Sequence, residues 1–91
     1  MTHVAPAAYV GRMDIAARID VILSTLNATD VGSLDSVVAK LENVQQELVA
    51  MDQSELAGRA GEAIAKLKQG EIAEFKRLRA FLQSRIGHLR P

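Results

Sequence analysis

Apolar residues recur at helical spacing along almost the whole chain, and its only two prolines, Pro6 and Pro91, stand near its ends. Proline breaks a helix interior because it lacks the backbone donor and clashes with the preceding turn. A chain without internal proline can therefore remain helical throughout, and the spacing predicts an all-α protein. We expect one domain over residues 1–91, since a chain of 91 residues supports one small hydrophobic core.

The spacing predicts a bundle of three helices, over about residues 7–26, 34–51 and 53–88. The first helix has an apolar face that repeats every three or four residues, formed by Ile15, Ile19, Ile22 and Leu26. We expect it to end in the polar, turn-rich stretch 27–32. Ser33 follows this stretch and is suited to cap the N-terminus of the second helix.

The second helix carries a coiled-coil type of repeat, in which two interleaved sets of apolar residues recur every seven positions. These sets are Leu34, Leu41 and Leu48, and Val37, Val44 and Met51. Asp52 and Glu55 have the spacing of a capping box, which predicts that a new helix begins at Asp52.

An eleven-residue repeat begins at Leu56 and continues through Leu67, Leu78 and Leu89. Eleven residues in three turns is close to the natural period of the α-helix, so we expect one long helix that bends at Gly70. Such a helix would be about 54 Å long. The alternative is a break at Gly70, which would give four helices, but a single-residue connection is too tight for an ordinary antiparallel hairpin.

The start of this segment is rich in small residues, including Gly58 and Gly61. Glycine inside a helix costs about 1 kcal/mol relative to alanine, so we expect another helix to approach closely here.

A helix of about 54 Å would extend some 20 Å beyond two helices of about 30 Å each. Exposed apolar helix surface of that size marks an interface, which predicts a homodimer or a complex with another helical protein. Glu71 falls on the apolar stripe, where a polar group in the interface would fix the register. The interface candidates are Leu67, Glu71, Phe75, Leu78, Phe81 and Leu82.

The chain has no net charge, yet its charges are separated along the sequence. Residues 1–74 hold all 11 acidic residues and six basic ones, for a net charge of −5, and residues 75–91 hold five basic residues and no acid. These five, Lys76, Arg77, Arg79, Arg85 and Arg90, form a candidate basic patch. They would dock on nucleic acid, an acidic protein or an anionic membrane surface, or they would be solvated bases that answer the acidic residues across a subunit or hairpin. Their dispersal around the apolar side of the helix favours solvated bases.

No sequence motif for catalysis or metal binding is present. Cysteine is absent, and the two histidines, His3 and His88, stand at opposite ends of the chain without a carboxylate at ligand spacing. No apolar run is long enough for a membrane span, and no signal peptide is recognisable. We therefore expect a cytoplasmic, non-enzymatic protein without a cofactor or metal.

These observations predict a helical protein–protein interaction or assembly module that associates with itself. The alternative is a small nucleic-acid-binding regulator that uses its basic C-terminal helix.

Overall fold

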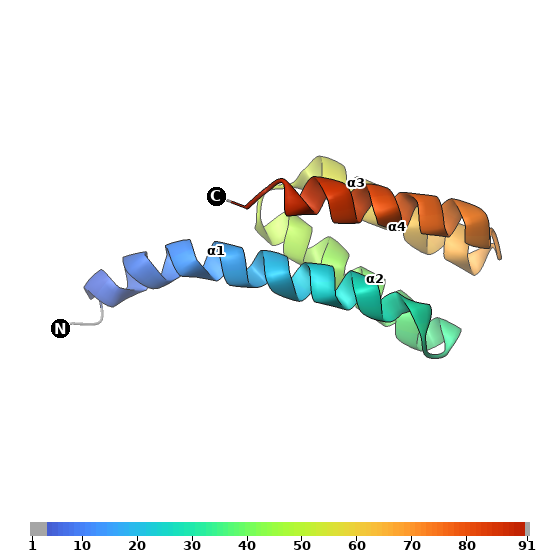
Figure 1. The fold of residues 1–91 in the computed structure, drawn as a ribbon, viewed down its shortest axis with the longest axis horizontal. Helices are drawn as coiled ribbons and strands as arrows, with labels where there is room; N and C mark the ends of the chain where they lie inside the picture. The colour runs from blue at the N-terminus through green and yellow to red at the C-terminus, as the bar shows by residue number, and fades with distance from the viewer. Residues whose placement is uncertain (1–3, 91) are drawn as a thin grey trace.

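The computed structural model describes the backbone of residues 4–90 and the side chains of residues 15–90. Its helices are α1 (Val4–Asn27), the short 3-10 helix η1 (Ala28–Asp30), α2 (Leu34–Ala50), α3 (Ser54–Lys68) and α4 (Ile72–Gly87), and the described residues contain no strand. Consecutive helices run antiparallel, and each packs against two neighbours in the order α1, α2, α3, α4 (Figure 1). The predicted all-α class is confirmed, but the bundle has four long helices rather than three.

The predicted long helix is wrong because the chain reverses at Gly70. Gly70 has a φ of +78°, in the left-handed region that glycine adopts without a steric cost. The Gly70 N–H donates to the carbonyl of Leu67 at 3.0 Å, and the Glu71 N–H donates to the carbonyl of Lys66 at 2.9 Å. These two bonds form a Schellman motif, which ends α3 and directs the chain into α4. The 20 Å of bare helix expected from the sequence therefore does not exist.

The connection between α2 and α3 has the same design. Asp52 has a φ of +66°, its N–H donates to the carbonyl of Val49 at 3.0 Å, and the Gln53 N–H donates to the carbonyl of Leu48 at 2.8 Å. Asp52 thus terminates α2 instead of capping α3. The predicted capping box is wrong, because Gln53 occupies the N-cap of α3 and its side chain makes no capping hydrogen bond.

The N-terminus of α2 agrees with the sequence prediction. Ser33 is its N-cap, and the Ser33 hydroxyl oxygen accepts a hydrogen bond from the Ser36 N–H at 3.2 Å. This bond satisfies one of the backbone donors that a helix leaves free at its start.

One hydrophobic core runs through the bundle, and all four helices contribute to it. The largest side chains that are almost completely buried are Ile19, Ile22, Leu26, Leu41, Val44, Leu48, Leu82 and Ile86. The two repeats near the N-terminus hold only in part, because Ile15 and Leu34 are 44% and 51% exposed. The buried parts of α3 and α4 face each other and the same core, which explains why the apolar repeat continues across the break at Gly70.

The small residues of α3 let this helix approach α2 closely. Ala57, Ala60 and Ala63 are buried, and a Cβ atom at Gly61 would lie 2.9 Å from Nε2 of Gln45. The Gln45 amide donates to the carbonyl of Ala57 at 3.2 Å. The expected close approach is therefore present, and its partner is α2 of the same chain.

Polar contacts connect α1 and η1 to α4 and to the residues that follow it. Arg90 pairs with Asp20, and the Gln83 amide donates to Oδ1 of Asn27 at 2.7 Å. Further along, Arg79 donates to Oδ1 of Asp30 at 2.6 Å. From the first of these contacts to the third, the residue from α1 or η1 lies later in the sequence and its partner lies earlier. The three contacts therefore share one antiparallel register.

Candidate functional site

The predicted interface residues do not form one surface. Phe75 and Leu82 are 3% and 0% exposed and belong to the core of the single chain. Leu67 and Leu78 are partly buried against the same core. Glu71 is exposed at the N-cap of α4, outside any apolar stripe, because the chain reverses immediately before it. Only Phe81 keeps a large exposed apolar surface, at 37%.

The candidate basic patch is also divided between two sides of α4. The Arg79 side chain is only 15% exposed, donates to Oγ1 of Thr29 at 3.0 Å and to Asp30, and lies over the Phe75 ring at 5.5 Å. Arg90 pairs with Asp20, so both of these bases attach α4 to the N-terminal part of the chain.

The other three bases remain at the surface. Arg77 is bound to Glu74 at 3.0 Å, and the Arg85 guanidinium lies 5.4 Å from the centroid of the Phe81 ring. Lys76 is exposed at the end of the bundle, where it borders a hollow next to the η1–α2 loop.

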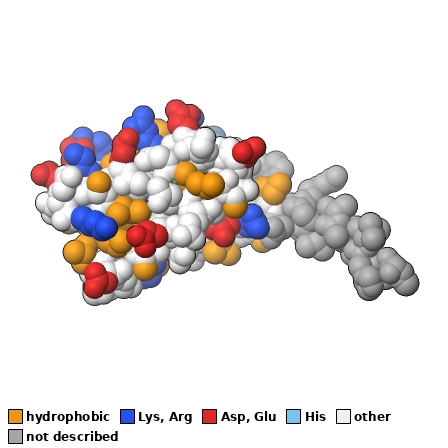
Figure 2. Space-filling model, turned by 180° about the vertical axis from the view of Figure 1, so that it is seen from behind, with side chains coloured by type: hydrophobic (Ala, Val, Ile, Leu, Met, Phe, Trp, Pro, Cys, Tyr) orange, Lys and Arg blue, Asp and Glu red, His pale blue; other side chains and the backbone are white. Residues whose placement is uncertain are grey.

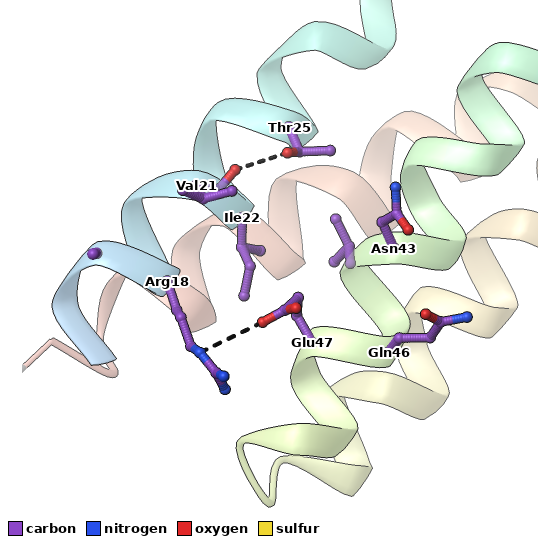
Figure 3. Close-up of a pocket in the computed structure, with 9 residues that line it drawn as sticks. Arg18, Val21, Ile22, Thr25, Asn43, Gln46 and Glu47 are labelled. Atoms are coloured by element: carbon purple, nitrogen blue, oxygen red, sulfur yellow. Dashed lines mark hydrogen bonds and ion pairs between the residues drawn. The ribbon is translucent and has the colours of Figure 1, made fainter. Parts of the chain in front are cut away.

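An open groove lies between α1 and α2, where its hollow is accessible from the surface. It encloses about 400 Å³. Its lining consists of Ala17, Arg18, Val21, Ile22 and Thr25 from α1 and Asn43, Val44, Gln46 and Glu47 from α2 (Figure 3). Ile22 and Val44 are each 1% exposed and form its apolar floor, whereas Val21 is 61% exposed on its α1 wall.

Helical periodicity places these side chains along the groove. Arg18, Val21 and Thr25 follow one another at intervals of three and four residues, so they lie on one side of α1. The Thr25 hydroxyl donates to the carbonyl of Val21 at 2.8 Å, which satisfies this polar group within its own helix. The α1 wall thus presents Val21 between a polar position and a cation.

An ion pair crosses the groove near one end. Nε of Arg18 lies 3.8 Å from Oε1 of Glu47, and the two side chains are 40% and 45% exposed (Figure 3). An exposed pair at this distance contributes little to stability, and either partner can exchange for another ion at low cost. The groove therefore offers an apolar floor with one positive and one negative charge beside it, which suits the docking of an apolar side chain flanked by charges.

The sequence pattern does not single out Arg18, Val21 or Glu47 as functional residues. One signal was available, because Val21 is an apolar residue outside the repeat that Ile19 and Ile22 belong to. An apolar residue beside the buried stripe of a helix indicates that the apolar surface of the helix is wider than the part that the core covers. The position of Glu47 across from Arg18 depends on how α1 and α2 pair, which a helical repeat does not specify.

The part of the chain with described side chains holds no group of three or more His, Cys, Asp or Glu side chains that could bind a metal ion. His88 lies in that part, with Nδ1 2.7 Å from the carbonyl oxygen of Ser84, and His3 lies outside it. Among the described helices, none is both long and apolar enough to cross a membrane.

Comparison with known proteins gave no match to a protein-family model, to a curated protein or to a solved structure.

Proposed function

We propose that the protein is a non-enzymatic assembly module that forms a dimer through the groove between α1 and α2. The exposure of Val21, 61% on the wall of an apolar groove, carries this proposal. Covering such a valine, at the rim of a hollow with a buried apolar floor, with a second surface removes apolar area from water and lowers the free energy.

The charges of the groove favour a second copy of the chain as the partner. A twofold dimer places the same surface of both copies together, so that each residue of one copy meets a different residue of the other reciprocally. Arg18 and Glu47 stand on opposite walls of one groove. A twofold axis along the groove would place the α1 wall of each copy opposite the α2 wall of the other, with Arg18 facing Glu47 and Val21 covered by the partner's groove. Such a surface is complementary to itself in charge as well as in hydrophobicity.

Nucleic-acid binding has weaker support. Arg77, Arg79 and Arg90 are each paired with a carboxylate of the same chain, so they are partly neutralised before any phosphate could approach. The face formed by α2 and α3 shows acidic and basic side chains interspersed among its described residues (Figure 2). Phosphate backbones favour continuous basic surfaces.

The proposal is tested by the mass of the protein in solution. Sedimentation equilibrium at physiological salt, over the micromolar range, should show a reversible dimer for the unmodified chain. Val21→Glu should shift it to monomer, because each copy would place a carboxylate on the apolar rim of the groove. Val49→Glu is a matched control, since Val49 is 60% exposed on α2 and does not line the groove, and this variant should remain a dimer.

A charge reversal gives a second test that leaves the apolar surface intact. Glu47→Arg should weaken the dimer by placing two cations in each groove, and Arg18→Glu combined with Glu47→Arg should restore it. Circular dichroism should show unchanged helix content in all variants. A monomeric unmodified chain, or equal losses in the Val21 and Val49 variants, would contradict the proposal. Retention of a nucleic-acid oligonucleotide by the monomer would instead favour the regulator.

A further inference from the structure

A second surface, on the far side of the bundle from this groove, carries an exposed aromatic ring between arginines. The ring of Phe81 on α4 is approached by the guanidinium carbon of Arg85 at 5.4 Å and by that of Arg59 on α3 at 5.9 Å. Arg77 precedes Phe81 by one helical turn, and its side chain is 73% exposed. Exposed aromatic and arginine side chains in contact are typical of protein-binding hot spots. We call Arg77, Phe81 and Arg85 the α4 ridge.

The charge of this surface is not balanced within the chain. Glu74 binds Arg77, and Glu62 binds Arg59, but Arg85 forms no ion pair with a described residue. The α4 ridge therefore keeps the positive charge of Arg85 next to an aromatic ring, and Arg77 is held by Glu74 only in an exposed pair that can exchange at low cost. The complement of the ridge is a surface with carboxylates on both sides of a small apolar residue.

The exposed side of α2 has that composition. Asp35, Ala39 and Glu42 are all exposed and lie on one side of the helix, because they are separated by four and three residues. Neither carboxylate pairs with a cation among the described side chains. We call these three residues the α2 face.

The two surfaces also match in dimensions. At 1.5 Å per residue, the arginines of the α4 ridge are about 12 Å apart along the helix, and the carboxylates of the α2 face are about 10.5 Å apart. Ala39, the smallest member of the α2 face, stands between the two carboxylates, as Phe81 stands between the two arginines. The methyl group of Ala39 leaves space for the Phe81 ring.

We propose that the α4 ridge of one molecule docks on the α2 face of a second copy, head to tail. The two surfaces cannot meet within one molecule, because α2 and α4 are diagonal in the bundle and do not contact each other. A contact between two different surfaces is heterologous, and it leaves a free ridge and a free face for further copies. The contact goes beyond the groove dimer and does not depend on it.

Salt controls this contact more strongly than it controls the groove. Salt screens exposed charges, with a Debye length of about 10 Å at 0.1 M ionic strength. At lower ionic strength the Debye length is longer, so the attraction between the two surfaces is screened less. Species larger than a dimer should therefore form at low salt and dissolve as salt is added, whereas the groove dimer, which also buries apolar surface at Val21, should respond less to salt.

Paired charge reversals test the contact by light scattering at low salt. Arg77→Glu with Arg85→Glu should raise the concentration at which species larger than a dimer form by about tenfold or more, because attraction becomes repulsion. Asp35→Arg with Glu42→Arg should do the same. An equimolar mixture of the two double variants should form large species again, because each reversed ridge then meets a reversed face.

Two further variants separate this contact from general effects of charge. Lys68→Glu with Lys76→Glu changes the net charge as much as the reversed ridge does, but on side chains outside it, and should leave the large species in place. Phe81→Ala should raise the concentration at which the large species form at low salt, without changing any charge. Val21→Glu should abolish the groove dimer and keep the head-to-tail contact. Absence of large species from the unmodified chain, failure of the mixture to restore them, or an equal loss in the lysine variant would overturn the proposal.

Discussion

The two connections around α3 solve the same geometric problem with different residues. Both are Schellman motifs in which the residue after the C-cap adopts a left-handed conformation, at φ +66° for Asp52 and +78° for Gly70. Glycine has no Cβ and enters this region freely, whereas an L-residue meets its own backbone there. Aspartate tolerates the region better than most residues because its short polar side chain can interact locally.

The difference shows that the hydrogen-bond pattern, and not the glycine, defines this type of turn. The α2–α3 connection reverses the chain without glycine, at some cost in backbone strain. The α3–α4 connection uses the residue for which that cost vanishes. If this comparison is correct, exchanging residues at the two positions must have opposite effects on stability.

The largest effect is expected at Gly70. Gly70→Ala should lower the free energy of unfolding by about 1 to 2 kcal/mol, because alanine must then adopt the left-handed conformation. No heavy atom lies within 4 Å of a Cβ built at Gly70, so the loss would report on the backbone alone. Urea unfolding followed by circular dichroism measures this loss. An unchanged midpoint would show that a left-handed conformation at position 70 has no cost for alanine.

Gly58 provides the corresponding test in a helix interior. It lies within α3, and no heavy atom lies within 4 Å of a Cβ added there. Gly58→Ala should raise the free energy of unfolding by up to about 1 kcal/mol, through higher helix propensity and a less flexible unfolded chain. The same urea experiment would show a higher midpoint. A loss as large as that of Gly70→Ala would indicate that every glycine here is needed, whatever its conformation.

The smallest effect is expected at Asp52. Asp52→Gly relieves the left-handed strain but makes the unfolded chain more flexible, so a net gain of about 0.5 kcal/mol is expected. Asp52→Ala, which lacks both the flexibility of glycine and the polar side chain, should instead lower stability. The urea midpoints of the two variants should shift in opposite directions. Equal shifts would mean that the left-handed conformation at position 52 has no cost.

Helical spacing predicted the all-α class and most of the core, because the apolar residues that recur with the period of a helix lie on the side that the core buries. It did not predict the reversal at Gly70, since an apolar repeat shows which side of a helix is buried and not whether the chain folds back. Phe75 and Leu82 were assigned to an interface for the same reason. The groove at Val21 escaped prediction, and so did the partners of Arg79 and Arg90, because they depend on contacts between residues far apart in sequence.

The polar contacts between α1 and α4 have a consequence for the time at which the protein can complete its fold. Arg90 pairs with Asp20 across 70 positions of the sequence. Contacts between α2 and α3, which follow each other directly in the sequence, close a short loop, whereas contacts between α1 and α4 close a loop that contains both of the other long helices. The contacts between α1 and α4 are therefore expected to form among the last, and until then the side of α1 that faces α4 is open to other chains.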